Sequence, residues 1–125
     1  MIPYEDVLFM MRNCVAVINP SRFEGWSSTV EEAKSIGKRV LLSDIPVHRE
    51  QNPNHALYFG PDDLPGVCSA ILNVWNVDEV APPEWQREAA GSLRERTRCF
   101  GEKYLRLVET VLNNHISADS IASCE

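Results

Sequence analysis

Residues 14–43, CVAVINPSRFEGWSSTVEEAKSIGKRVLLS, hold two apolar runs separated by one helix-length segment. The runs are residues 14–18 and 39–43, and continuous apolar runs of this length are typical of strands that are buried on both faces. Two such strands joined through a helix require a parallel, right-handed crossover. The stretch therefore predicts a βαβ unit.

The helix between the two strands has start and stop signals in the sequence. Ser28, followed three residues later by Glu31, reads as a capping box, so we expect the helix to begin near Ser28. Gly37 is suited to the left-handed residue that ends a helix. The first helical amides, at about Thr29 and Val30, have no intrahelical carbonyl partner, and with the helix dipole they favour an anion such as phosphate.

Two carboxylates flank this predicted anion site. Glu24 precedes the helix, and Glu32 lies one turn inside it. Ionised carboxylates accept hydrogen bonds from hydroxyl groups, and a vicinal sugar diol offers two. Gly25 lets the loop backbone approach a ligand closely. The layout predicts a diphosphate with a sugar on each side, at the edge of the sheet where the strands end.

The run Pro20-Ser21-Arg22-Phe23-Glu24-Gly25-Trp26, with Glu32 eight positions after Glu24, resembles the signature of retaining GT-B glycosyltransferases of the family 4 type. Those enzymes carry two glutamates separated by seven residues, in a pattern that reads roughly P-S-x-x-E-G-F-G and ends in Glu-Ala. Here Trp26 stands for the aromatic residue and Glu32-Ala33 for the final pair. Ser27 in place of Gly, and Ser28 in place of an apolar residue, depart from the pattern.

The resemblance implies a role for each residue of the motif. Glu24 would be catalytic, contacting the transferred sugar. The amides from Trp26 to Ser28, between Gly25 and Thr29, would hold the diphosphate, and Glu32 would hold the ribose hydroxyls. The donor would be a nucleotide diphosphate sugar, transferred with retention and without a cofactor or metal. For Glu31 we prefer a role in helix stability and solubility.

The resemblance extends over about residues 4–114 and corresponds to the later part of the donor-binding domain. The acceptor-binding domain would then be supplied in cis or in trans, and we expect little activity from this chain alone. The alternative is a non-catalytic binding module or a truncated remnant of such an enzyme.

The remaining segments complete an α/β fold. We expect a Rossmann-like parallel sheet of about three strands with flanking helices, a long C-terminal helix, one partial domain over residues 1–114 and a flexible tail over 115–125. Helices are predicted at 4–12 and after Asp62 or Asp63, and the third strand at 56–59. In the last helix one stripe predicts core packing; its members are Phe100, Tyr104, Leu107, Val108, Val111 and Leu112.

The loop after the second strand has alternative interpretations. Asp44 is expected to cap a short helix with Pro46 in its first turn. A phosphoacceptor role for Asp44, as in receiver domains, lacks the accompanying acidic pair and lysine. For His48 and Arg49 we favour a solvated pair over contact with a phosphate.

Composition restricts the classes of partner. Twelve basic against eighteen acidic residues give a net charge of −6, which argues against binding nucleic acid. The four cysteines are far apart and predict reduced, mostly buried thiols and no zinc site. No apolar run reaches the length of a membrane span, so we expect a cytoplasmic location. The basic residues of the last helix predict a solvated face, or docking onto a partner domain or the membrane surface.

Overall fold

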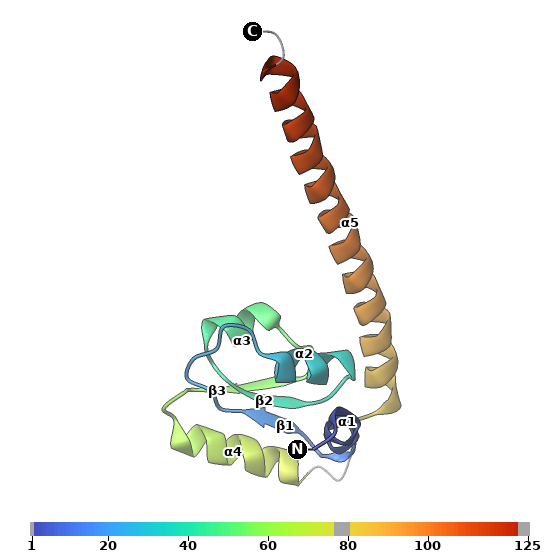
Figure 1. Ribbon diagram of the computed structural model, residues 1–125. Helices are drawn as coiled ribbons and strands as arrows, with labels where there is room; N and C mark the ends of the chain where they lie inside the picture. Colours follow the sequence, from blue (N-terminus) through green and yellow to red (C-terminus); the bar gives the residue numbers. More distant parts are fainter. Residues whose placement is uncertain (1, 77–80, 123–125) are drawn as a thin grey trace. The chain divides into compact units, whose positions relative to one another are not determined.

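The computed structural model describes the backbone of residues 2–76 and 81–122, and the side chains of these residues except 114–122. The chain forms two compact units, Met1–Gly91 and Ser92–Glu125 (Figure 1).

A parallel three-stranded sheet forms the centre of the first unit. Its strands are β1 (Val17–Asn19), β2 (Val40–Ser43) and β3 (Ala56–Phe59), in the spatial order β1-β2-β3. Val40 pairs with Val17 on one side and with Ala56 on the other. The predicted α/β class with a three-stranded parallel sheet is confirmed, and the carboxyl ends of the strands meet at one edge.

Helices cover both faces of this sheet. α2 (Ser28–Ser35) connects β1 to β2, and α3 (Pro46–Gln51) connects β2 to β3. Figure 1 shows α2 and α3 on one face and α4 (Leu64–Trp75) on the other. The predicted first helix is α1 (Tyr4–Asn13). The predicted cap at the start of α4 is Asp63, which accepts a hydrogen bond from the amide of Gly66 at 3.0 Å.

The core has two layers because alternate residues of β2 point to opposite faces. On the α2 side, the buried cluster contains Met11, Val30, Ala33, Val40 and Leu42. On the α4 side, it contains Leu41, Phe59 and Val74. All four residues of β2 are buried, as expected for a central parallel strand.

The prediction that residues 14–18 form a strand buried on both faces is wrong in two respects. β1 begins only at Val17, and Ile18 is 43% exposed. The physical reason is that β1 is an edge of the described sheet, with a strand on one side only. On α4, Leu64, Leu72 and Trp75 are exposed, and Val74 is the buried residue.

The long helix α5 (Pro83–Ala122) begins in the first unit. The Trp85 ring stacks on His55 with 3.6 Å between ring centroids, and the Arg39 guanidinium lies 5.2 Å from the centre of the Trp85 ring. Gly37, which follows α2, has a φ of 66°, as predicted for a left-handed stop. Its Cα approaches the backbone of Trp85 so closely that a Cβ would lie 2.4 Å from the Trp85 carbonyl oxygen.

The second unit contains the rest of α5 as a single helix. The stripe predicted to be core is exposed there: Phe100 is 71% exposed and Leu107 is 61% exposed. That prediction is wrong because the described part of this unit holds no second element for the stripe to pack against. The tail predicted over 115–125 overlaps α5 up to Ala122, its last three residues lie outside the described part, and its flexibility stays a prediction.

Two sequence-based expectations concern cysteines and membranes. Cys14, Cys68 and Cys99 are free thiols and none is fully buried, which corrects the expectation of mostly buried thiols; Cys124 lies outside the described residues. Within the described ranges, no helix combines the length and apolarity needed to span a bilayer.

Candidate functional site

Asn19, the last residue of β1, organises the loop that leads to α2. Its buried amide nitrogen donates to Ser27 Oγ at 3.0 Å and to Glu24 Oε1 at 3.2 Å, and its Oδ1 accepts from the amide of Ser21 at 3.1 Å. Asn19 was not among the residues predicted for the site. The signal that was available is its place at a strand end before Pro20-Ser21, where Asn side chains commonly bond the backbone two residues on.

Glu24 is held by this loop in its ionised form. Its Oε1 accepts from Ser21 Oγ at 2.8 Å as well as from Asn19. The hydrogen bonds from Ser21 and then from Asn19 lower the pKa of Glu24 below its ordinary value. The loop therefore presents a fixed negative charge directly after the carboxyl end of β1.

The capping residue of α2 is Ser27, one position before the predicted Ser28. Ser27 Oγ accepts from the amide of Val30 at 3.4 Å, while Ser28 is the first helical residue. The prediction that Ser28 is the cap fails because both serines are good caps locally. The buried hydrogen bond from Asn19 selects Ser27. Glu31, expected to reach back to the cap, instead accepts from Gln51 Nε2 at 3.3 Å.

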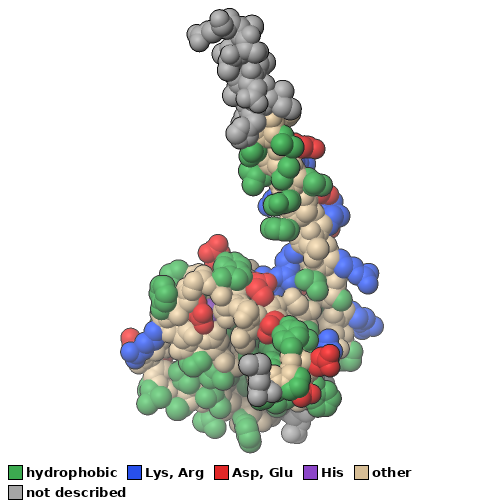
Figure 2. Space-filling view, in the orientation of Figure 1, with side chains coloured by type: hydrophobic (Ala, Val, Ile, Leu, Met, Phe, Trp, Pro, Cys, Tyr) green, Lys and Arg blue, Asp and Glu red, His purple; other side chains and the backbone are tan. Residues whose placement is uncertain are grey.

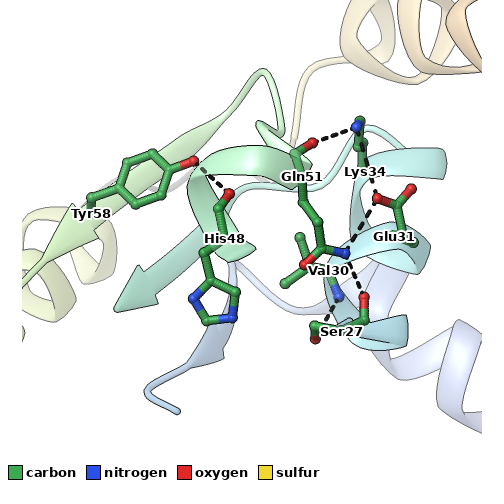
Figure 3. A network of polar contacts seen from close by, with 7 residues as sticks. All are labelled: Ser27, Val30, Glu31, Lys34, His48, Gln51 and Tyr58. Carbon is green, nitrogen blue, oxygen red and sulfur yellow. Dashed lines mark hydrogen bonds and ion pairs between the residues drawn. The ribbon is translucent and has the colours of Figure 1, made fainter. Parts of the chain in front are cut away.

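α3 supports the beginning of α2 through Gln51 (Figure 3). The Gln51 side chain is buried, and its Nε2 donates to the Ser27 carbonyl at 2.8 Å. Lys34 Nζ donates to the Gln51 carbonyl at 2.5 Å and lies 3.9 Å from Glu31 Oε1. This network fixes the N-terminal turn of α2 from the side of α3, and none of its Gln51 contacts was predicted from the sequence.

The predicted diphosphate-binding residues surround this turn. Trp26, Ser28 and Thr29 are exposed and Ser27 is buried. The amides of Ser28 and Thr29 have no preceding helical carbonyl to which they can donate, because they belong to the first turn. Their exposed position leaves them available to a ligand, whereas the Ser27 hydroxyl is already engaged in the cap.

Glu32 lies on α2 apart from the Glu24 loop. Its Oε1 accepts from the Tyr4 hydroxyl of α1 at 3.1 Å, and this hydrogen bond raises the pKa of Tyr4. The two glutamates thus have separate protein partners, Asn19 and Ser21 for Glu24 and Tyr4 for Glu32.

The loop after β2 differs from its prediction. Asp44 does not cap α3, whose N-cap is Ile45; instead its carboxylate pairs with Arg49 at 2.6 and 2.7 Å. The Arg49 guanidinium also lies 3.8 Å from the centre of the Tyr58 ring. The Asp44 carboxylate and the Arg49 guanidinium therefore already have partners within the protein, and the hydrogen bonds from Arg49 lower the pKa of Asp44.

His48 is fully buried, so the predicted solvated position is wrong. Its Nδ1 lies 2.9 Å from the Ser43 carbonyl and 3.2 Å from Ser43 Oγ, and Ser43 Oγ also donates to the Ser21 carbonyl. Figure 3 shows the His48 backbone carbonyl accepting from the Tyr58 hydroxyl at 3.2 Å. Tertiary packing at the end of β2 buries the ring and links it to the Glu24 loop through Ser43 and Ser21.

A cavity of about 270 Å³ opens between the Glu24 loop and the start of α3. Its lining combines two carboxylates, one guanidinium and an apolar wall: Arg22, Phe23, Glu24, Gly25, Ile45, Pro46, Val47 and Glu50. Phe23 is 87% exposed, and the Arg22 guanidinium pairs with Asp62 at 2.5 Å. Carboxylates that accept hydrogen bonds from hydroxyl groups, next to an apolar surface, suit a carbohydrate ring.

Metal ligands are not gathered at this site. Across residues 2–76 and the described part of α5, no group of three or more His, Cys, Asp or Glu side chains is placed to hold a metal ion. Metal independence nevertheless stays a prediction.

Comparison with known proteins gives one informative match. The chain is 34% identical over 73 residues to the O-antigen chain mannosyltransferase RfbU of Salmonella typhimurium strain LT2. The match covers 58% of this chain and 21% of that enzyme, so the aligned part spans about a fifth of the relative's length. No protein-family model matches the chain, and no solved structure gives a significant match. The match to RfbU supports a glycosyltransferase relationship for this chain.

Proposed function

We propose that this chain is the donor-binding part of a retaining glycosyltransferase of the GT-B type that uses a nucleotide diphosphate sugar. The observation that carries the proposal is the pre-arranged turn at the start of α2. There the cap, the Asn19 bonds and Gln51 hold the first turn of α2, whose exposed residues Ser28 and Thr29 lie in the sequence between Glu24 and Glu32. The relationship to a mannosyltransferase supports the same reaction class.

Each part of the turn has a chemical role in this proposal. The exposed amides and the helix dipole bind the diphosphate. Glu32 accepts from the ribose hydroxyls, and ionised Glu24 accepts from hydroxyls of the transferred sugar and stabilises positive charge developing beside it. The cavity beside Glu24 receives the sugar ring. Because RfbU is named a mannosyltransferase, mannose is the first sugar to test.

This chain by itself offers little stabilisation to the departing diphosphate. A departing diphosphate is normally stabilised by cations. Near the site, Arg22 is paired with Asp62 and Arg49 with Asp44. We therefore propose that transfer needs basic residues from the preceding part of the donor-binding domain and an acceptor-binding domain, in cis or in trans, and that this chain alone has little activity. The second candidate is a binding module or a truncated remnant without catalytic activity.

Ligand-dependent thermal unfolding tests the donor site. The ligands are uridine, guanosine and adenosine diphosphates and their mannose and glucose conjugates. A ligand at hundredfold excess over its dissociation constant adds about 2.7 kcal/mol of stability. We expect a shift with one nucleotide that is lost in Glu32→Ala and retained in Glu5→Ala, the same change at an exposed position of α1. Absence of a shift with every ligand would contradict the donor site.

A further inference from the structure

The second unit presents a helix whose side chains are sorted by type. In an α-helix, residues seven apart lie nearly above one another, so each such series forms one strip. Leu93, Phe100 and Leu107 form one strip of α5, and Tyr104 and Val111 lie on the adjacent one. We call these five side chains the apolar strip. All five are exposed, from 41% for Leu93 to 71% for Phe100.

Acidic residues lie on the opposite side of this helix. Glu95, Glu102 and Glu109 follow one another at seven-residue spacing, which places them about half a turn from the apolar strip. Arg98 faces this side, because it pairs with Glu95 and Glu102 at 2.5 Å each. The acidic series and its counter-charge therefore point away from whatever contacts the apolar strip.

Basic residues flank the apolar strip. By helical position, Arg94 lies along one border, and Arg96 and Lys103 lie along the other. In Figure 2, hydrophobic side chains gather along one side of the described part of this helix, and charged side chains lie along the other. An exposed apolar strip with basic borders and an acidic back is the layout of helices that lie in a membrane interface.

We propose that this part of α5 binds the surface of an anionic phospholipid bilayer, with the apolar strip in the acyl boundary and the exposed Arg94 and Lys103 at the lipid phosphates. Long basic side chains keep their charge at the headgroups while their stems cover apolar surface. Charge complementarity disfavours a second copy of the chain as the occupant. Two copies that join their apolar strips find, over residues 93–113, no acidic side chain on the borders to meet the basic ones.

Cosedimentation of the full chain with vesicles tests this assignment. The vesicles are phosphatidylcholine, with and without phosphatidylglycerol. We expect binding that depends on phosphatidylglycerol and weakens with salt. Lys103→Gln should weaken binding roughly fivefold, whereas Arg98→Gln, the loss of one charge on the acidic side, should change it less than about twofold.

A matched pair of leucines tests the apolar strip. Leu107, in the strip, is 61% exposed, and Leu105, seven residues after Arg98 and outside the strip, is 62% exposed. Leu107→Ser should weaken binding at least roughly tenfold, and Leu105→Ser much less. Circular dichroism checks that the variants stay helical. Equal loss from both leucine variants, or no binding of the unaltered chain to phosphatidylglycerol vesicles, would overturn the proposal. So would a dimer that Leu107→Ser dissociates and that binds no vesicle.

Discussion

Ser27 is the residue on which the beginning of α2 depends, because its hydroxyl joins two elements. It accepts from the Val30 amide as the helix cap and from Asn19 at the end of β1, and both contacts are buried. Ser28, its neighbour, is exposed in the first turn and lacks these contacts. Two adjacent residues with the same side chain thus have different energetic roles.

Replacing these serines separates the two roles. Ser27→Ala removes the cap and leaves the Asn19 amide short of a partner, so the free energy of unfolding should fall by about 1 to 2 kcal/mol. Ser28→Ala should change it by less than about 0.5 kcal/mol. Urea unfolding of both variants measures the difference. Equal effects would place the cap at Ser28 after all.

Two neighbouring side chains, Ser21 and Asn19, donate hydrogen bonds to the Glu24 carboxylate and favour its ionised form. Because the folded-state pKa is below the unfolded value, Glu24 contributes stability above its unfolded pKa, and this contribution is lost as the pH falls through the folded pKa. Ser21→Ala removes the larger of the two effects and should raise the pKa of Glu24 toward its ordinary value. An NMR titration of the Glu24 carboxyl carbon measures this shift.

Ser69→Ala, at an exposed position of α4, serves as the control for that titration. An unchanged Glu24 pKa in Ser21→Ala would show that the Ser21 hydroxyl does not hold the carboxylate in solution.

At the scale of elements, the junction of α2 and α5 depends on Gly37. Its positive φ ends α2, and its missing side chain admits the Trp85 backbone. Gly37→Ala should therefore lower the free energy of unfolding by more than about 1 kcal/mol, because the positive φ strains the alanine backbone and its Cβ displaces the Trp85 backbone. Gly25→Ala is the matched control, since a Cβ there meets nothing within 4 Å. Urea unfolding compares them, and a neutral Gly37→Ala would contradict the close approach.

The sequence predicted elements better than it predicted their surroundings. The apolar runs located β2 and β3, and the Gly37 and Asp63 signals located the end of α2 and the start of α4, because these features are local. Helical spacing also predicted that Phe100, Tyr104, Leu107 and Val111 share one face of α5. Periodicity says which residues share a face and not what covers it, so the exposure of Phe100 could not be predicted.

The candidate site shows the same limit. Glu24 and the turn at α2 follow from adjacent residues and were found in the sequence. The residues that hold them, Asn19 and Gln51, act across the fold, and the burial of His48 results from packing between α3 and the end of β2. Contacts between distant parts of the sequence are not encoded in local spacing.

In the molecule as a whole, the first unit holds the proposed binding site for a nucleotide diphosphate sugar. The groups proposed to bind the ligand all lie at the carboxyl edge of one sheet and in the helix that follows β1. The apolar strip belongs to the second unit, and the ligand proposed for it is a lipid surface. Ligand binding at the first unit should therefore leave α5 beyond Ser92 unaffected.

Amide chemical-shift mapping shows, residue by residue, where the donor binds. An isotope-labelled sample of the full chain is titrated with nucleoside diphosphate mannose conjugates, and backbone shifts are followed residue by residue. We predict saturable changes concentrated at residues 24–32, with Ser28 and Thr29 among the largest, and none at residues 93–113. Saturable changes centred elsewhere, or no change with any conjugate, would contradict the assignment of this turn as the donor site.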